Sequence, residues 1–166
     1  MKKVIFFLAA LFSISLAIAQ HEAQVIRVID GDTFVAKWGK KIFTCRLKNV
    51  DAPELTQNFG FESYRALSDL IIAHKIMITP YRVDLYGRRL VAVTVDNKRV
   101  DSILIRDGFA WLYVNYCNEA LLKRCMQDAI DNKSGLWHFG KEGVCPPWLY
   151  RNYNYRNKLK YCKGCK

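Results

Sequence analysis

Apolar and polar residues alternate along three short segments near the start of the chain, residues 24–30, 33–38 and 41–50. In the third segment Phe43, Cys45 and Leu47 share one face, and Thr44 and Arg46 share the other. A period of two predicts half-buried β-strands, and the Asp-Gly and Gly-Lys pairs between the segments are typical of turns. Residues 75–83 and 89–95 predict two more strands, joined by the turn sequence DLYGR.

Three other stretches have the spacing of amphipathic helices. Residues 64–74 place Tyr64, Leu67, Leu70, Ile71 and His74 three or four apart, residues 99–108 end at a glycine suited to a helix cap, and residues 121–130 are followed by Gly135. Residues 109–114 are apolar and favour an extended conformation. We therefore predict an α+β domain: a five-stranded OB-fold β-barrel (oligonucleotide-binding barrel) with about three α-helices.

The first 19 residues have the composition of a signal peptide. Lys2 and Lys3 precede an apolar run, and Ala17-Ile18-Ala19 offers a cleavage site after Ala19. The run is shorter than the ~20 residues that a membrane span needs, so we expect no stable membrane insertion. The expected organisation is a signal peptide (1–19), an exported domain, secreted or periplasmic (20–140), and a C-terminal extension (141–166).

The chain is basic, with 26 Lys and Arg against 15 Asp and Glu. A positive balance favours polyanionic partners such as nucleic acid, the cell wall or anionic lipid. The extension has aromatic residues interleaved with Lys and Arg, as in segments that stack bases of a single strand. A disulfide-pinned cover over the barrel explains the same extension equally well.

Six cysteines follow the signal peptide, and export makes disulfides the default. Cys45 shares the apolar face of its strand and is expected to be a buried free thiol. Cys117 and Cys125 flank a short loop that leads into a helix, which suits a local bridge. Cys145 is then left to pair with Cys162 or Cys165 and clamp the C-terminal end.

Carboxylates gather in two loops that follow strands, Asp30 with Asp32 in DGDT and Asp51 with Glu54 in NVDAPE. Hard oxygen ligands without a neighbouring His or Cys suit Ca²⁺ or Mg²⁺. Arg46 is directed away from the apolar face of its strand, and Arg88 follows a Tyr-Gly turn. Arginine holds two phosphate oxygens in its planar fork. Acids and arginines together indicate a metal-assisted phosphodiester site.

Four motifs in order, VIDGDTF, CRLKNVDAPE, DLYGRRL and LIRDGFAWLY, make residues 25–137 resemble the staphylococcal nuclease (thermonuclease) family. The resemblance implies an OB-fold barrel with three helices. It also implies Ca²⁺-dependent hydrolysis of DNA and RNA phosphodiester bonds that leaves 3′-phosphate ends.

The resemblance also assigns roles to single residues. Asp32 and Asp51 match the calcium carboxylates, Ala52 a backbone-carbonyl ligand, and Asp30 an acid that acts on the metal through water. Glu54 matches the general base, and Arg46 and Arg88 match the arginines that bind phosphate. The residues near the bound nucleotide correspond to Tyr86, Tyr113 and Tyr116.

We therefore expect a monomeric, exported, calcium-dependent nuclease with little sequence preference. A non-catalytic OB-fold module that binds nucleic acid is the alternative, and such a module is expected to have lost the base or the arginines. A basic protein of the wall or of a lipid surface is a third reading, supported only by charge and by the C-terminal extension.

Overall fold

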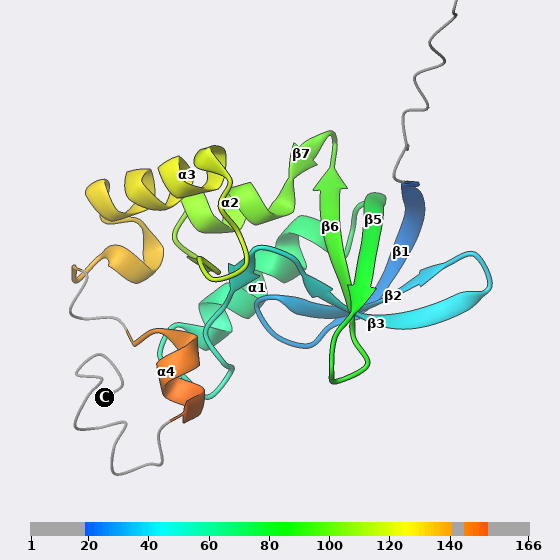
Figure 1. Ribbon diagram of the computed structural model, residues 1–166, viewed down its shortest axis with the longest axis horizontal. Helices are drawn as coiled ribbons and strands as arrows, with labels where there is room; N and C mark the ends of the chain where they lie inside the picture. The colour runs from blue at the N-terminus through cyan, green and yellow to red at the C-terminus, as the bar shows by residue number, and fades with distance from the viewer. Residues whose placement is uncertain (1–18, 141–144, 153–166) are drawn as a thin grey trace, which may run out of the picture.

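Five strands of this chain form a closed barrel in the computed structural model, which describes residues 19–140 and 145–152. The strands are β1 (His21–Val28), β2 (Thr33–Trp38), β3 (Lys41–Leu47), β5 (Ile76–Val83) and β6 (Arg89–Val95). They pair antiparallel in the order β3-β2-β1-β5-β6, and a parallel pairing of β3 with β6 closes the barrel (Figure 1). The predicted α+β fold on a five-stranded OB-type barrel is confirmed.

The interior of the barrel is made by the apolar faces of the alternating segments. Phe34 of β2 lies opposite Cys45 of β3, and both side chains are fully buried. Because successive strand residues point to opposite faces, Arg46 beside Cys45 cannot join this core. Arg46 instead lies opposite Thr33, the first residue of β2, next to the loop that carries the first acidic pair.

Three helices pack against the barrel: α1 (Gly60–Ile71), α2 (Val100–Arg106) and α3 (Ala120–Asp131). Leu67, Leu104 and Leu122 bring one side chain from each helix into the shared core. α1 begins and ends earlier than its sequence pattern predicted, and His74 lies beyond its end. Gly108 follows α2 with a φ of 75° and donates its N–H to Ile105, as expected of a residue that ends a helix.

Short elements connect these parts. β4 (Val50–Asp51) pairs with β8 (Trp111–Leu112), and β7 (Lys98–Arg99) turns back and pairs antiparallel with the end of β6. The 3-10 turn η1 (Gly135–Trp137) follows α3. β8 is the strand within the apolar stretch 109–114. A fourth helix, α4 (Pro147–Asn152), lies beside the loop that follows β4 (Figure 1). In the part of the chain described, no helix is long and apolar enough to cross a membrane.

The cysteine predictions have mixed outcomes. Cys45 is a fully buried free thiol as predicted, and burial raises its pKa to about 12. The predicted Cys117–Cys125 bridge is wrong, because both thiols are free. Cys125 lies on the buried face of α3 with Leu122 and Ala129, and Cys117 also packs into the main core. Cys162 and Cys165, the predicted partners of Cys145, lie outside the described residues. Residues 1–18 of the predicted signal peptide also lie outside them.

The free thiols can be tested by peptide mapping. When the protein is unfolded and alkylated without reductant, we expect Cys45, Cys117 and Cys125 each to carry the alkyl group. Trypsin cuts between Cys117 and Cys125, at Lys123 and Arg124, so a bridge would hold two tryptic peptides together until reduction. Recovery of that linked pair by mass spectrometry would contradict the structure.

Candidate active site

The two acidic loops are in direct contact because Gly31 has no side chain. A Cβ atom at Gly31 would lie 2.7 Å from the Cβ atoms of both Ala52 and Ser63, closer than real atoms approach. The neighbouring carboxylate reaches across the same contact, since Asp32 Oδ2 accepts the backbone N–H of Ala52 at 2.9 Å. The glycine of DGDT therefore serves close packing of the Asp32 loop against the Asp51 loop.

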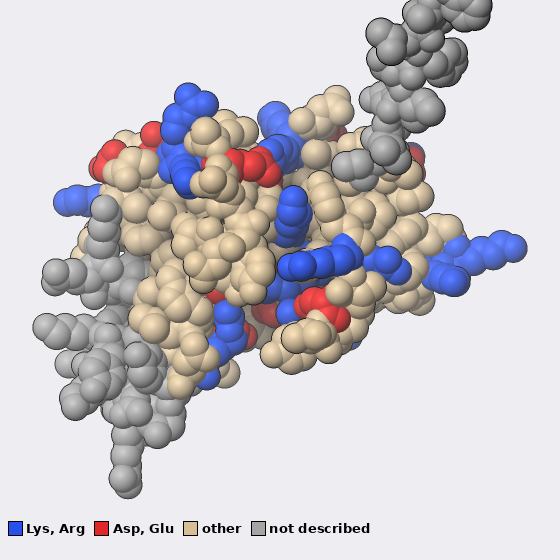
Figure 2. Space-filling view, in the orientation of Figure 1, with Lys and Arg blue, Asp and Glu red and all other residues tan. Residues whose placement is uncertain are grey.

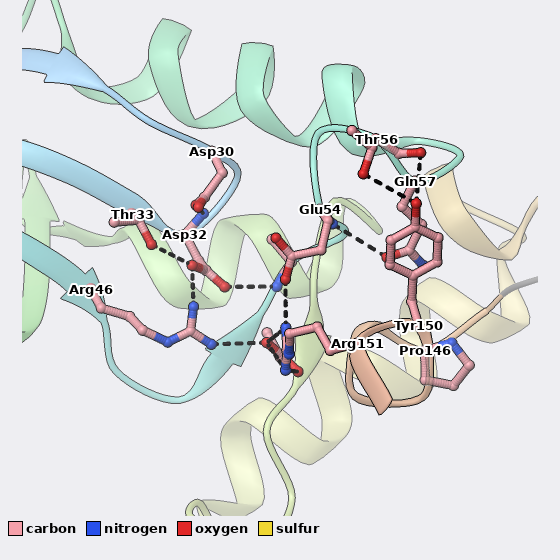
Figure 3. Close-up of polar contacts among 12 residues, drawn as sticks. Asp30, Asp32, Thr33, Arg46, Glu54, Thr56, Gln57, Pro146, Tyr150 and Arg151 are labelled. Carbon is pink, nitrogen blue, oxygen red and sulfur yellow. Dashed lines mark hydrogen bonds and ion pairs between the residues drawn. The ribbon is translucent and has the colours of Figure 1, made fainter. Parts of the chain in front are cut away.

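Arg46 joins the carboxylates of the two loops. One terminal nitrogen of its guanidinium donates to Asp32 Oδ1, and the other donates to Asp51 Oδ1 at 2.8 Å (Figure 3). Asp32 Oδ1 also accepts the hydroxyl of Thr33 at 2.9 Å. Because Arg46 is on a barrel strand and its side chain is only 12% exposed, it holds Asp32 and Asp51 in a fixed mutual position.

Burial makes these carboxylates sensitive to the charges around them. Asp51 is completely buried and Asp32 is 2% exposed. Burial raises the pKa of Asp51, and the charge of Asp32 acts in the same direction, while Arg151 and Arg46 oppose the shift. Burial and the charge of Asp32 raise the pKa of Asp30 to about 7. A further positive charge would stabilise the ionised forms of all three acids.

Glu54 lies at the start of a compact turn that leads into α1. Its backbone N–H donates to Gln57 Oε1 at 3.3 Å, and its carbonyl accepts the N–H of Gln57 at 2.8 Å. Gly60 packs against this carbonyl so closely that a Cβ there would overlap it. The Glu54 side chain is 36% exposed, far more than Asp51, so it reaches solvent at the edge of the buried pair.

Arg88 is held in place by a residue that sequence analysis did not single out. Asp84 Oδ2 accepts from Arg88 Nε at 2.8 Å, and Asp84 Oδ1 accepts the backbone N–H groups of Arg88 and Tyr86 at 2.9 Å. Burial acts to raise the pKa of Asp84, but these hydrogen bonds outweigh it and lower the pKa below its ordinary value. Arg88 does not contact the carboxylates around Arg46, but its guanidinium is fixed beside the exposed ring of Tyr86.

One open pocket brings most of the predicted site residues together. Its lining includes Asp30, Asp32, Arg46, Glu54, Arg88, Tyr86, Tyr113 and Tyr116, with Asp51 buried beneath. Tyr113 and Tyr116 lie with ring centroids 4.6 Å apart. Lys48, also in the pocket lining, stands 4.3 Å over the ring of Tyr81. Figure 2 shows Lys and Arg side chains gathered across the middle of the face viewed, over β5 and β6, with a small acidic patch below. A basic wall with exposed rings suits a nucleic-acid strand.

A polar network fixes the start of the Asp51 loop. Asn49 has a φ of 74°, a conformation that asparagine tolerates better than most residues, and it is 5% exposed. Its amide donates to Asp101 Oδ2 at 3.0 Å, and Arg99 binds both Asp101 and Glu119. The Asn49 carbonyl accepts the N–H of Tyr113 at 2.8 Å. The same residue therefore positions the Asp51 loop and one aromatic side of the pocket.

Arg151 of α4 also lies in this site, although no sequence pattern pointed to it. Its Nη2 lies 2.8 Å from Asp51 Oδ2, and its Nη1 lies 2.8 Å from Glu54 Oε1 (Figure 3). The residue is 100 positions from Asp51 in the chain, in an extension whose mixed basic and aromatic composition did not indicate which side chain reaches the barrel.

The donor set fits a hard divalent cation. Asp30, Asp32, Asp51 and Glu54 outnumber the two guanidinium groups that contact them, so the cluster has room for further positive charge. Among the residues that the structure describes, no group of three or more His, Cys, Asp or Glu side chains is placed so that it could hold a metal ion. Two carboxylates, the Ala52 carbonyl and water would instead make an open site, with ligands of the kind that Ca²⁺ and Mg²⁺ prefer.

Comparison with known proteins identifies relatives of the whole barrel. The family model described as "Staphylococcal nuclease homologue" matches residues 44–139. An uncharacterized endonuclease of Escherichia coli O157:H7 is 33% identical over 153 residues, which cover 92% of this chain and 99% of that protein. A micrococcal nuclease of Shigella flexneri is 28% identical over 144 residues, 80% of this chain and 82% of that protein. Staphylococcal-like nuclease CAN1 of Arabidopsis thaliana is 29% identical over 111 residues, 67% of this chain and 34% of that protein.

The contact at Gly31 can be tested by a double-mutant cycle with Ala52. Gly31→Ala inserts a methyl group into a filled space, and we expect it to lower the free energy of unfolding in urea by about 1–3 kcal/mol. Ala52→Gly removes one of the two Cβ atoms in the way. The double variant is therefore expected to lose less than the two single variants added together. Strict additivity would show that the two loops do not meet at this point.

Proposed function

Because this chain belongs to the staphylococcal nuclease homologue family, we propose that it is an exported, calcium-dependent nuclease acting on DNA and RNA with little sequence preference. The observation that carries the proposal is the convergence of Asp32, Asp51 and Glu54 with Arg46 at the base of a basic, aromatic-lined pocket. The matching family and the relatives named endonuclease and micrococcal nuclease make the chain a nuclease. The calcium requirement, the products and the export are part of the proposal.

Substrate binding is assigned to the pocket walls. Arg46 of β3 and Arg88, just before the paired strand β6, both line the pocket. Each guanidinium can hold two phosphate oxygens when it exchanges its carboxylate partner for phosphate. Tyr86, which is 83% exposed, and the Tyr113–Tyr116 pair offer faces on which bases or sugars can pack. Contacts to phosphate and to ring faces carry little sequence information, so a broad substrate range follows.

The hydrolytic step is assigned to Glu54 and the two arginines. Glu54 accepts a proton from a water molecule as the water oxygen bonds to phosphorus and the bond from phosphorus to the 5′-oxygen breaks. The 5′-oxygen takes a proton from solvent water, so the products are a 3′-phosphate and a 5′-hydroxyl. Arg46 and Arg88 stabilise the charge that develops on the phosphoryl oxygens. A general base typically raises the rate of hydrolysis ~10²–10⁴-fold, which is a small part of the barrier reduction of about 20 kcal/mol that such enzymes reach. Charge stabilisation must therefore supply most of the reduction in the barrier.

The cation would be held by Asp32, Asp51 and the Ala52 carbonyl, with Asp30 acting on it through water. When bound, it would supply positive charge next to the phosphoryl oxygens. Pro53 lies between Ala52 and Glu54 and restricts the backbone there, so that Asp51 and Glu54 keep different surroundings, one buried and one half-exposed. This arrangement favours catalysis over simple binding, because a binding module does not need a half-exposed base beside a buried acidic pair.

Glu54→Gln and Arg88→Ala are each expected to lower cleavage of single-stranded DNA by at least ~10²-fold, since one removes the base and the other a charge stabiliser. Initial rates would be measured in Ca²⁺, in Mg²⁺ and in EDTA. The wild-type protein should cleave in Ca²⁺ and stop in EDTA. Lys133→Ala, an exposed residue beyond the pocket, serves as the control and should keep the wild-type rate.

Three outcomes would contradict parts of the proposal. Wild-type rates in either variant would remove the role assigned to that residue. Undiminished cleavage in EDTA would overturn the metal requirement. Tight binding of DNA without cleavage under every metal condition would turn the barrel into a binding module.

A further inference from the structure

Arg151 covers the most deeply buried carboxylate of the site. Asp51 has no exposed surface, whereas the Arg151 side chain is 39% exposed and contacts both oxygens of Asp51. Arg46, the other guanidinium on Asp51, is only 12% exposed and is part of a barrel strand. A ligand that approaches Asp51 from solvent therefore meets Arg151 first.

Arg151 also engages the second carboxylate that the proposed reaction needs. Its Nη1 lies 2.8 Å from Glu54 Oε1, so one fork spans the proposed metal ligand Asp51 and the proposed base Glu54 (Figure 3). Arg151 thus supplies the positive charge between these two acids. A divalent cation at Asp51 would take over that charge and would repel the guanidinium.

The placement of Arg151 does not depend on its own ion pairs. α4 is fixed by the hydroxyl of Tyr150, which donates to the Thr56 carbonyl at 3.0 Å. Gln57 donates to the Cys145 carbonyl just before the helix, and Trp148 stacks edge-on against Trp111. These contacts seat α4 on the Glu54 loop, so a substitution of Arg151 alone leaves most of the attachment of the helix in place.

We propose that Arg151 is a built-in competitor of the metal: its guanidinium occupies Asp51 and Glu54 in the metal-free protein and must leave Asp51 for a divalent cation to bind. The inference rests on the proposed function, because it takes Asp51 as a metal ligand. It assigns α4, in the C-terminal extension, a specific role in setting the metal affinity of the site.

Metal affinity measured by calorimetry tests this role without any assay of cleavage. Ca²⁺ is titrated into the purified wild-type protein and into Arg151→Ala in metal-free buffer. We expect the Kd for Ca²⁺ to fall on the order of tenfold in Arg151→Ala, which corresponds to about 1.4 kcal/mol. Arg151→Lys keeps the charge but loses the fork that spans two carboxylates, and its Kd should lie between the two.

Arg106→Ala is the matched control. It also removes one guanidinium from an ion pair, with Asp107, but Arg106 does not line the pocket. Its Kd should equal the wild-type value, which would exclude a general effect of net charge. Thermal unfolding of each variant in EDTA verifies that the fold is retained.

The outcomes separate this inference from the proposed function. If wild-type protein and Arg151→Ala bind Ca²⁺ equally, or if the variant binds more weakly, Arg151 is not a competitor while the metal site stands. If neither protein binds Ca²⁺ or Mg²⁺, the calcium requirement in the proposed function is wrong and the inference is wrong with it. If Arg151→Ala changes only the affinity for a DNA oligonucleotide in EDTA, Arg151 is a phosphate ligand instead.

Discussion

The whole site depends on the cost of burying negative charge. Asp32 and Asp51 are removed from water, and an ionised carboxylate in that position is stable only beside positive charge or hydrogen-bond donors. Arg46 supplies both to the two acids at once because its strand register faces it away from the core and toward the loop before β2. Much of the architecture around the pocket can be understood as holding these three side chains in place. Gly31 lets the loops meet, and Asn49 ties the second loop to the helices.

This constraint links fold stability with the proposed chemistry. A cluster in which carboxylates outnumber guanidinium groups has a net negative charge and attracts a cation. Without that cation the cluster would repel the charged phosphate of a substrate, and with the cation bound it would stabilise the phosphate. The three arginines of the site differ in the carboxylates that they bind. Arg46 is bound to Asp32 and Asp51, whereas Arg88 is bound through Nε and Nη2 to Asp84, beside an exposed tyrosine ring. Arg151 adds a third guanidinium, delivered from outside the barrel by α4.

The sequence predicted what depends on local patterns. Alternation gave the five barrel strands because each strand has one buried face, and the acids and arginines were identified because each motif is contiguous. Gly31 was interpreted as a turn residue, since its contact with Ala52 and Ser63 is visible only in three dimensions. The role of Asp84 in holding Arg88 depends on how the hairpin closes. Arg151 could not be predicted, because it is 100 residues from Asp51. The error at Cys117 and Cys125 has the same origin, since closeness along the chain does not ensure that two thiols meet.

The most direct test of the account is a crystal structure of the protein grown with Ca²⁺. We predict an ion bound by the carboxylates of Asp32 and Asp51 and by the Ala52 carbonyl, with Arg151 no longer in contact with Asp51. An ion at this position would establish that the buried acids are a metal site. A structure at saturating Ca²⁺ in which Arg46 and Arg151 still bind Asp51, with no ion between Asp32 and Asp51, would contradict the central claim.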